Sequence, residues 1–518
     1  MQSTPWSRSL LYSITVVGCI WISLACVEPL CFFGSVLAPC LWAIGLRGSN
    51  QRTAIFLSGA FGAGGWVVSA WWLSAGISSM NSSYWWAGYA SVLILAANGA
   101  LPYIGLGVIS NHLELFDKNR PKPLLAAALV TLLVELWPTP FPGTLVNGIS
   151  SQIVFVQFAD LGGTPLVHFL LYAVGFLLAV AVGSETSVKN RARSVLMIVV
   201  VVMATGTYGV FRIGQWRARL TELPAIHVGL IQPNIPIAES RLSRGTPGTL
   251  DSLAIQTREL FSRSSDLHLV VWPEIPVYFA PFNAPKDRAF LSDLLKGTAV
   301  PLLASADLFA NEQRFDRIPF YNAVQLFVGD GEVRAEYRKM RLVPMGEYLP
   351  FEEYLSGPRM REFLRDVRRY APGRELSVVR VSPDVVVGTP ICLEALHSDH
   401  VGAMVRRGAR VLVVPSNDAY FGDTAGPGLN FSFSRLRAIE YRTPLVRVTN
   451  SGVSAAIDQT GEIVGGSLLP QFEPASAIVQ IHPSAATLGR LLPREQGLVF
   501  LSLISIGMLV IHLRKKAC

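Results

Sequence analysis

Eight apolar stretches, most of them long enough for a membrane-spanning helix, alternate with short polar connections along this chain. A helix needs roughly 20 apolar residues to cross about 30 Å of hydrocarbon. The second and fifth stretches are short and could instead be re-entrant or tightly paired helices. The pattern predicts a multi-span α-helical membrane bundle of about eight transmembrane helices, formed by residues 9–28, 31–46, 53–76, 84–110, 123–138, 164–183, 195–213 and 496–512.

The region between the seventh and eighth stretches, residues 214–495, has ordinary charge density and a different pattern. Short β-rich runs recur there with helical stretches between them, which predicts an α/β domain. Several runs are continuously apolar, as expected of strands covered by helices on both faces. The expected strands cover Ile226 to Gln232, Leu267 to Trp272, Pro301 to Ala306, Ala323 to Val328, Val385 to Thr389, Val411 to Val414 and Leu445 to Thr449.

If successive spans alternate in direction, all the basic clusters that flank them lie on the same side of the membrane. Cytoplasmic loops carry an excess of Lys and Arg, so both termini are expected in the cytoplasm. This divides the chain into a transmembrane region (1–213, about seven helices), an extracytoplasmic domain (214–495), and a last helix with a basic tail (496–518). The clusters are Arg8, Arg47 with Arg52, Lys118 to Lys122, Lys189 to Arg193, and Arg514 to Lys516.

Composition agrees with a membrane protein, since 51% of the 518 residues are hydrophobic, only 15% are charged, and mean hydropathy is +0.40. The net charge of +8 lacks the basic, aromatic-interleaved face of a nucleic-acid-binding protein. Cys392 is the one cysteine within 214–495, so that region can form no internal disulfide. A cleaved signal peptide ending near Ser23 to Cys26 is an alternative for the first span, but an uncleaved helix is expected because more spans follow.

Three reactive residues come directly after strand-like runs, where catalytic groups of α/β folds gather. They are Glu274, Lys339 and Cys392. Each alone has an ordinary structural interpretation: Glu274 as a solvated carboxylate, Lys339 as one cation of a basic surface run, and Cys392 as an inert core cysteine. No Gly-x-Ser-x-Gly elbow occurs, and the histidines show no metal-ligand spacing, so no metal and no cofactor is predicted.

The segments Trp272-Pro273-Glu274, Tyr337-Arg338-Lys339 and Ile391-Cys392-Leu393-Glu394 resemble the Glu-Lys-Cys motifs of the nitrilase (carbon-nitrogen hydrolase) superfamily. Further segments look like its membrane-bound branch, apolipoprotein N-acyltransferase: Leu342 to Glu347, Ser416 to Gly422 and Arg437 to Glu440. The resemblance implies an α-β-β-α sandwich on the periplasmic side of the bacterial inner membrane. It also implies that an acyl chain moves from a phospholipid to the amino group of an apolipoprotein's N-terminal diacylglyceryl cysteine.

The three residues suit this chemistry. A thiol with an ordinary pKa of about 8.5 needs a base to become a thiolate, and Glu274 is the candidate for Cys392. Lys339 would stabilise the negative charge that develops on the carbonyl oxygen. The supporting candidates are Glu347, Glu394, Asn322, Ser416 and Asn417.

The chain departs from the family pattern at Leu393, at Tyr420 and at Gly428-Leu429-Asn430, which changes the expected pocket wall. Three alternatives stay open: a membrane-anchored nitrilase-type amidase, an acyltransferase dedicated to one partner protein, and a non-catalytic transporter or assembly factor. Glu28 and Glu135 lie near span ends, where an ion relay is not expected. Residues 422–428 are glycine-rich, which predicts a mobile lid.

Overall fold

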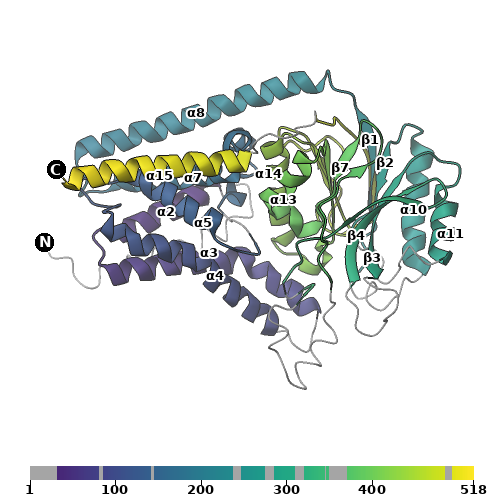
Figure 1. Ribbon diagram of the computed structural model, residues 1–518, viewed down its shortest axis with the longest axis horizontal. Helices are drawn as coiled ribbons and strands as arrows, with labels where there is room; N and C mark the ends of the chain where they lie inside the picture. Colours follow the sequence, from purple (N-terminus) through teal and green to yellow (C-terminus); the bar gives the residue numbers. More distant parts are fainter. Residues whose placement is uncertain are drawn as a thin grey trace. The chain divides into compact units, whose positions relative to one another are not determined.

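The structure, a computed structural model, describes residues 32–80, 86–141, 145–236, 247–274, 285–309, 320–344, 346–348, 370–484 and 493–517. The chain forms two compact units. Unit 1 comprises Met1–Ser74, Tyr89–Gln215 and Leu491–Cys518, and its described elements are helices. Unit 2 comprises Ala75–Gly88 and Trp216–Arg490 and contains all the described strands (Figure 1).

Unit 1 is organised around α7 (Ala159–Val182), which packs against α2, α5 and α15. A Cβ atom at Gly175 would lie 2.7 Å from the carbonyl oxygen of Val36, so the close approach of α7 to α2 requires a glycine. The remaining helices of this unit are mostly long and apolar. The elements are α2 (Phe32–Leu46), α3 (Gln51–Met80), α4 (Trp86–His112), α5 (Pro123–Leu136), η4 (Asn147–Ile149), α6 (Ile153–Val156), α8 (Val188–Leu220) and α15 (Pro493–Ala517).

Five described helices are long and apolar enough to cross a membrane, so the predicted multi-span bundle is confirmed. Two predicted spans are shorter helices, Phe33–Leu46 and Pro123–Leu136, and the predicted first span, 9–28, lies outside the described residues. The count of eight stays a prediction. Only 17% of the apolar stretch of α8 is buried, and side chains such as Leu196 and Met203 are exposed, as expected of a surface that faces lipid.

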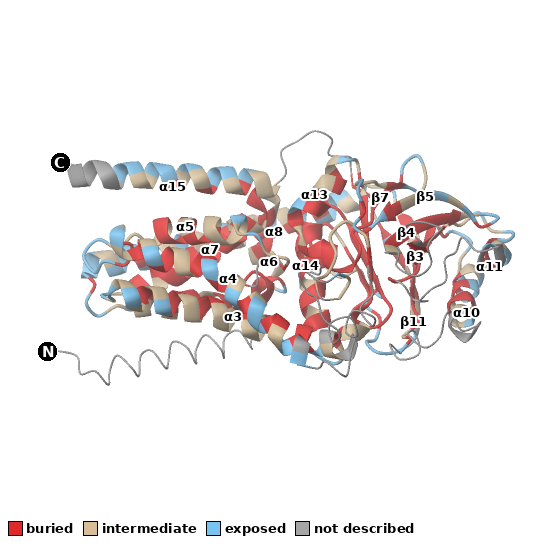
Figure 2. Cartoon of the chain, turned by 60° about the horizontal axis from the view of Figure 1, so that its bottom comes forward, coloured by how far each residue is buried: buried red, intermediate tan, exposed pale blue. Residues whose placement is uncertain are grey.

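Unit 2 is built on two sheets with helices on their outer faces (Figure 1; Figure 2). The first sheet has the order β11-β1-β2-β3-β4-β5 and the second β10-β9-β8-β7-β6. The strands are β1 (Ile226–Gln232), β2 (Leu269–Val271), β3 (Leu302–Phe309), β4 (Phe320–Val328), β5 (Glu332–Arg338), β6 (Val379–Arg380), β7 (Val386–Gly388), β8 (Val411–Ser416), β9 (Leu445–Thr449), β10 (Ala455–Ile457) and β11 (Ala475–Ile481).

The helices that cover the sheets are α10 (Pro247–Arg263) and α11 (Pro285–Leu295) on one side, and α13 (Ser398–Arg406) and α14 (Gly426–Tyr441) on the other. Leu253 of α10 and Leu291 of α11 are fully buried in one core with the first sheet. Most strand residues are buried, as Figure 2 shows. The α-β-β-α sandwich expected from the sequence is confirmed.

All seven expected strands occur, two of them, β1 and β9, with the expected bounds. Four strands were not expected: β5, in which charged residues interrupt the apolar pattern, the seven-residue β11, and β6 and β10, which are only two and three residues long. Within the predicted lid 422–428, Gly426 and Gly428 lie in the first turn of α14, while residues 422–425 precede the helix. The lid stays a prediction.

Candidate active site

Glu274 follows the buried end of β2 and is held there by the strand before it. The Trp272 side chain is fully buried, and its indole N–H donates to Thr257 Oγ1 on α10 at 3.0 Å. The backbone N–H of Glu274 donates to the carbonyl oxygen of Ser416 at 3.3 Å, which joins the end of β2 in the first sheet to the end of β8 in the second. The carboxylate therefore lies where the strand ends of the two sheets meet.

Lys339 follows β5 and is buried between two carboxylates. Its Nζ lies 3.0 Å from Glu274 Oε1 and 2.7 Å from Glu347 Oε1, with only 1% of the side chain exposed. Asn322 Nδ2 donates to the same two oxygens, at 2.8 and 3.3 Å. The structure thus brings together four of the predicted residues, and Asn322 and Lys339 form the bridge between the two carboxylates.

The charges in this cluster determine its protonation. Burial alone would lower the pKa of Lys339, but Glu274, Glu347 and Cys392 raise it well above its usual value, so Lys339 is an ammonium. Burial raises the pKa of Glu347, and Lys339 opposes that shift. The cluster is a fixed cation beside paired carboxylates in a water-poor site, which is suited to stabilising an oxyanion.

Cys392 begins η6 (Cys392–Leu396), after a three-residue connection from β7, and has φ of 53°. Non-glycine residues rarely adopt this left-handed region, and such strain persists only where the surroundings hold it. Burial, and then Glu274, raise the pKa of the Cys392 thiol, while Lys339 lowers it in part. Cys392 is therefore a neutral thiol at rest, and Lys339 alone does not make it a thiolate.

Two protein-family models match this chain. Residues 228–490 match the family model for carbon-nitrogen hydrolases, and residues 16–177 match that for the N-terminal domain of apolipoprotein N-acyltransferase. The chain belongs to the carbon-nitrogen hydrolase family. Within it, the chain has the two-domain composition of the apolipoprotein N-acyltransferase branch.

Named relatives span most of the chain. The apolipoprotein N-acyltransferase of Vibrio cholerae serotype O1 is 29% identical over 87% of this chain and 87% of that protein. That of Brucella melitensis biotype 1 is 27% identical over 79% of this chain and 76% of that protein. The solved structure of Saccharomyces cerevisiae Nit3, of the nitrilase superfamily, is 18% identical and covers 50% of this chain and 90% of that chain with a TM-score of 0.39.

Glu394 connects the segment that carries the ammonium with the segment that carries the thiol of this carbon-nitrogen hydrolase. Its carboxylate accepts hydrogen bonds from the backbone N–H groups of Met340 at 2.7 Å, Arg341 at 2.9 Å and Ile391 at 2.9 Å. Burial would raise the pKa of Glu394, but His400 and these N–H groups lower it, so the group is a carboxylate. These hydrogen bonds hold the backbone that follows Lys339 and the backbone that precedes Cys392.

Behind Cys392 lies a buried polar network. Ser416 Oγ is 3.2 Å from Cys392 Sγ and 3.0 Å from Asp418 Oδ1. Arg447 Nη2 donates to Ser416 Oγ at 2.9 Å and to both Asp418 oxygens. Because Ser416 has a single hydroxyl proton, it can donate to the sulfur or to the carboxylate, and Arg447 holds the acceptor side in place.

Asn417 shapes the loop that carries this network. Its side-chain oxygen accepts from the backbone N–H of Ala419 at 3.3 Å at the start of η7 (Asp418–Phe421), and from Asn450 Nδ2 at 3.2 Å. One departure from the family pattern, Asn430, is buried and donates to Asp418 at 3.1 Å. Another, Leu393, is buried and directly follows Cys392 in the chain.

Sequence reasoning missed Asp418 and Arg447 as members of the site. A signal was present, because Arg447 interrupts the otherwise apolar strand β9, whose residues are all buried. A charged residue at the centre of a buried strand needs a partner. The sequence does not say which of the acidic residues that partner is.

Proposed function

We propose that this chain is a membrane acyltransferase that moves a fatty acyl chain from a phospholipid, through a thioester on Cys392, to the amino group of the N-terminal diacylglyceryl cysteine of apolipoproteins. The observation that carries the proposal is the buried Lys339–Glu274 pair at 3.0 Å, electrostatically coupled to the Cys392 thiol. The same chain has a bundle matching the N-terminal domain of apolipoprotein N-acyltransferases, which supports a lipid donor.

In the first half-reaction, the sulfur of Cys392 attacks the ester carbonyl as its proton moves to Glu274. Lys339 stabilises the oxyanion, a role whose loss typically costs about 2.7 to 4 kcal/mol of barrier. The carbon–oxygen bond then breaks, and Glu274 returns the proton to the departing lysophospholipid oxygen. The products are a Cys392 thioester and a lysophospholipid.

In the second half-reaction, the amine of the acceptor attacks the thioester carbonyl. A carbon–nitrogen bond forms, Glu274 accepts the amine proton, and the carbon–sulfur bond breaks. The proton passes to the departing sulfur, which regenerates the thiol. The raised pKa of Cys392 agrees with a resting thiol that starts each cycle protonated.

We place the protein in the bacterial inner membrane with the catalytic domain, 214–495, on the periplasmic side. The basic clusters near span ends support this orientation. The exposed apolar face of α8 supports contact with lipid. An amidase acting on soluble amides would need one anchor only, so the multi-span bundle favours the acyltransferase over this alternative.

The test is to incubate the purified protein with radiolabelled phospholipid alone, quench it in acid, and look for a hydroxylamine-labile label on the chain. We expect label on the wild type and on Cys40→Ala, the control at the other described free cysteine, and none on Cys392→Ala. A diacylglyceryl peptide should then discharge the label onto its amine. No label on a folded wild type, or release of free fatty acid in place of transfer, would favour the amidase.

A further inference from the structure

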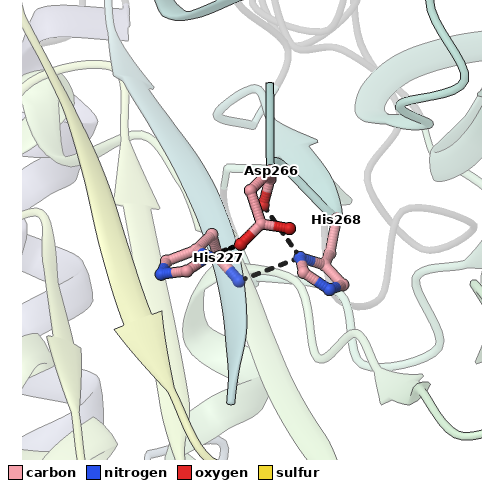
Figure 3. Close-up of side chains that lie close together, drawn as sticks. All are labelled: His227, Asp266 and His268. Carbon is pink, nitrogen blue, oxygen red and sulfur yellow. Dashed lines mark hydrogen bonds and ion pairs between the residues drawn. The ribbon is translucent and has the colours of Figure 1, made fainter. Parts of the chain in front are cut away.

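Three potential metal ligands meet where β1 and β2 begin, at the opposite end of β2 from Glu274 (Figure 3). His227 is the second residue of β1, His268 directly precedes β2, and Asp266 lies two residues earlier. The two histidines are 41 residues apart in sequence. Strand pairing brings them together, which explains why sequence spacing gave no sign of a site.

The three side chains are close enough to share one ion. His227 Nδ1 lies 2.9 Å from Asp266 Oδ2, and one ligand atom of each residue lies within 4.8 Å of the others. Ligand atoms at the usual zinc distances of about 2.0 to 2.2 Å stand roughly 3.4 Å apart in a tetrahedron. The observed separations are therefore within a small side-chain adjustment of coordination.

The backbone preorganises the group. The N–H of His268 donates to the carbonyl oxygen of His227 at 2.9 Å, and the N–H of His227 approaches His268 Nδ1 at 3.2 Å. Both imidazoles thus project from the same paired backbone. Only small rotations of the side chains, including a turn of His268 away from that N–H, are needed to aim three lone pairs at one point.

A surface ion pair between His227 and Asp266 is the simpler interpretation, and such a pair contributes little to stability. In that interpretation the His268 imidazole takes no part in the ion pair, and its Nδ1 keeps its contacts with the carbonyl oxygen of Asp266 at 3.0 Å and the N–H of His227 at 3.2 Å. Among the described residues, Asp266 forms an ion pair with His227, and the Asp266 side chain is 71% exposed. With neutral imidazoles the group carries one negative charge and is open to solvent, which suits capture of a divalent cation.

We propose that His227, Asp266 and His268 bind a divalent transition-metal ion of the zinc class, with water in the remaining position. Two imidazole nitrogens and one carboxylate oxygen are a usual ligand set for zinc, whereas magnesium and calcium prefer oxygen ligands. The ion joins the start of β1 to the connection between α10 and β2. It stabilises the fold by binding the folded chain, and it takes no part in acyl transfer.

The first experiment titrates Zn²⁺ into chelator-treated, detergent-solubilised full-length protein and follows the heat of binding. We expect one saturable site per chain in the wild type and in His112→Ala, a control at an exposed histidine of unit 1. His268→Ala and Asp266→Asn should bind at least about tenfold more weakly. Equal binding by these variants, or no saturation in the wild type, overturns the proposal.

Two further readouts protect against a misfolded variant and a different site. Zinc should raise the unfolding temperature of the wild type but not of His268→Ala, while the two metal-free proteins unfold at similar temperatures. The visible spectrum with Co²⁺ should indicate tetrahedral nitrogen and oxygen ligands. A sulfur-to-cobalt charge-transfer band would place the ion on a cysteine and contradict the site.

Discussion

Arg447 Nη2 lies 2.8 Å from Asp418 Oδ1, and both side chains are fully buried behind Cys392. The pair connects β9 to the loop after β8, and through Ser416 it reaches the sulfur. Burial raises the pKa of Asp418, and Arg447 opposes that shift. Because Asp418 raises the pKa of Cys392, Arg447 also shields the thiol from this carboxylate.

Arg447→Met should destabilise unit 2 by about 3 to 5 kcal/mol, since it leaves a buried carboxylate without its partner. The double variant Arg447→Met/Asp418→Leu should recover most of that stability, because it removes both charges. Thermal unfolding measures both effects. If the pair also positions Cys392, the double variant should form the thioester more slowly than the wild type even though its stability is restored. A double variant that forms the thioester at the wild-type rate would limit the pair to a structural role.

Ser416→Ala should slow thioester formation by about 10- to 100-fold, because a hydrogen bond to a charged group contributes about 1.5 to 3 kcal/mol and this one would be to the thiolate. The Ser416 hydrogen bond lowers the pKa of Cys392, so its loss moves alkylation of the thiol to higher pH. Ser262→Ala, on the exposed face of α10, is the matched control. An unchanged alkylation profile would remove Ser416 from the site.

The raised pKa of Cys392 predicts how the free enzyme reacts with iodoacetamide. Below the thiol pKa the thiolate fraction, which is the reactive form, grows about tenfold for each pH unit. The alkylation rate at Cys392, followed by mass spectrometry of its peptide, should therefore keep rising from pH 7 to pH 10. A plateau below pH 8 would mean that the thiol is already ionised at rest.

Glu347→Gln should impair the enzyme most at alkaline pH. Glu274 and Glu347 both raise the pKa of Lys339 against the effect of burial. Without the Glu347 carboxylate, the pKa of Lys339 falls, so the Lys339 ammonium loses its proton at a lower pH than in the wild type. Acylation by Glu347→Gln should therefore decline at a lower pH than acylation by the wild type, whereas Glu274→Gln should lose about 10²- to 10⁴-fold at every pH. Matching pH profiles for Glu347→Gln and the wild type would exclude this role.

The sequence predicted most of the fold because its signals are local. Continuous apolar runs gave the helices of unit 1, and β-rich runs gave β1 and β9 with their bounds. It also pointed to Glu274, Lys339 and Cys392, because each follows a recognisable run and the three motifs occur in family order.

What the sequence could not give depends on contacts between distant segments. Arg447 meets Asp418 across 29 residues, and Glu394 meets Met340 across 54. Such pairs are decided by sheet order and loop paths, which no spacing encodes. Strand β5 was missed for a related reason, because its half-exposed charged residues are stabilised by pairing with β4 rather than by an apolar pattern.

Glu394→Gln tests whether the contacts between the Lys339 and Cys392 segments stabilise the site. An amide places N–H donors where backbone N–H groups already point, so we expect unit 2 to lose about 1.5 to 3 kcal/mol or more. The pKa of Glu394 is lower in the folded protein than in the unfolded chain. The Glu394 carboxylate therefore stabilises the folded state fully above the ordinary carboxyl pKa of about 4.3, and this stabilisation is lost as pH falls through the pKa of the folded protein. The difference in unfolding temperature between wild type and variant should therefore persist at pH 6 to 8 and shrink in acid. Glu375→Gln, at an exposed position, should show no such difference, and a gap that widens in acid would contradict the assigned charge of Glu394.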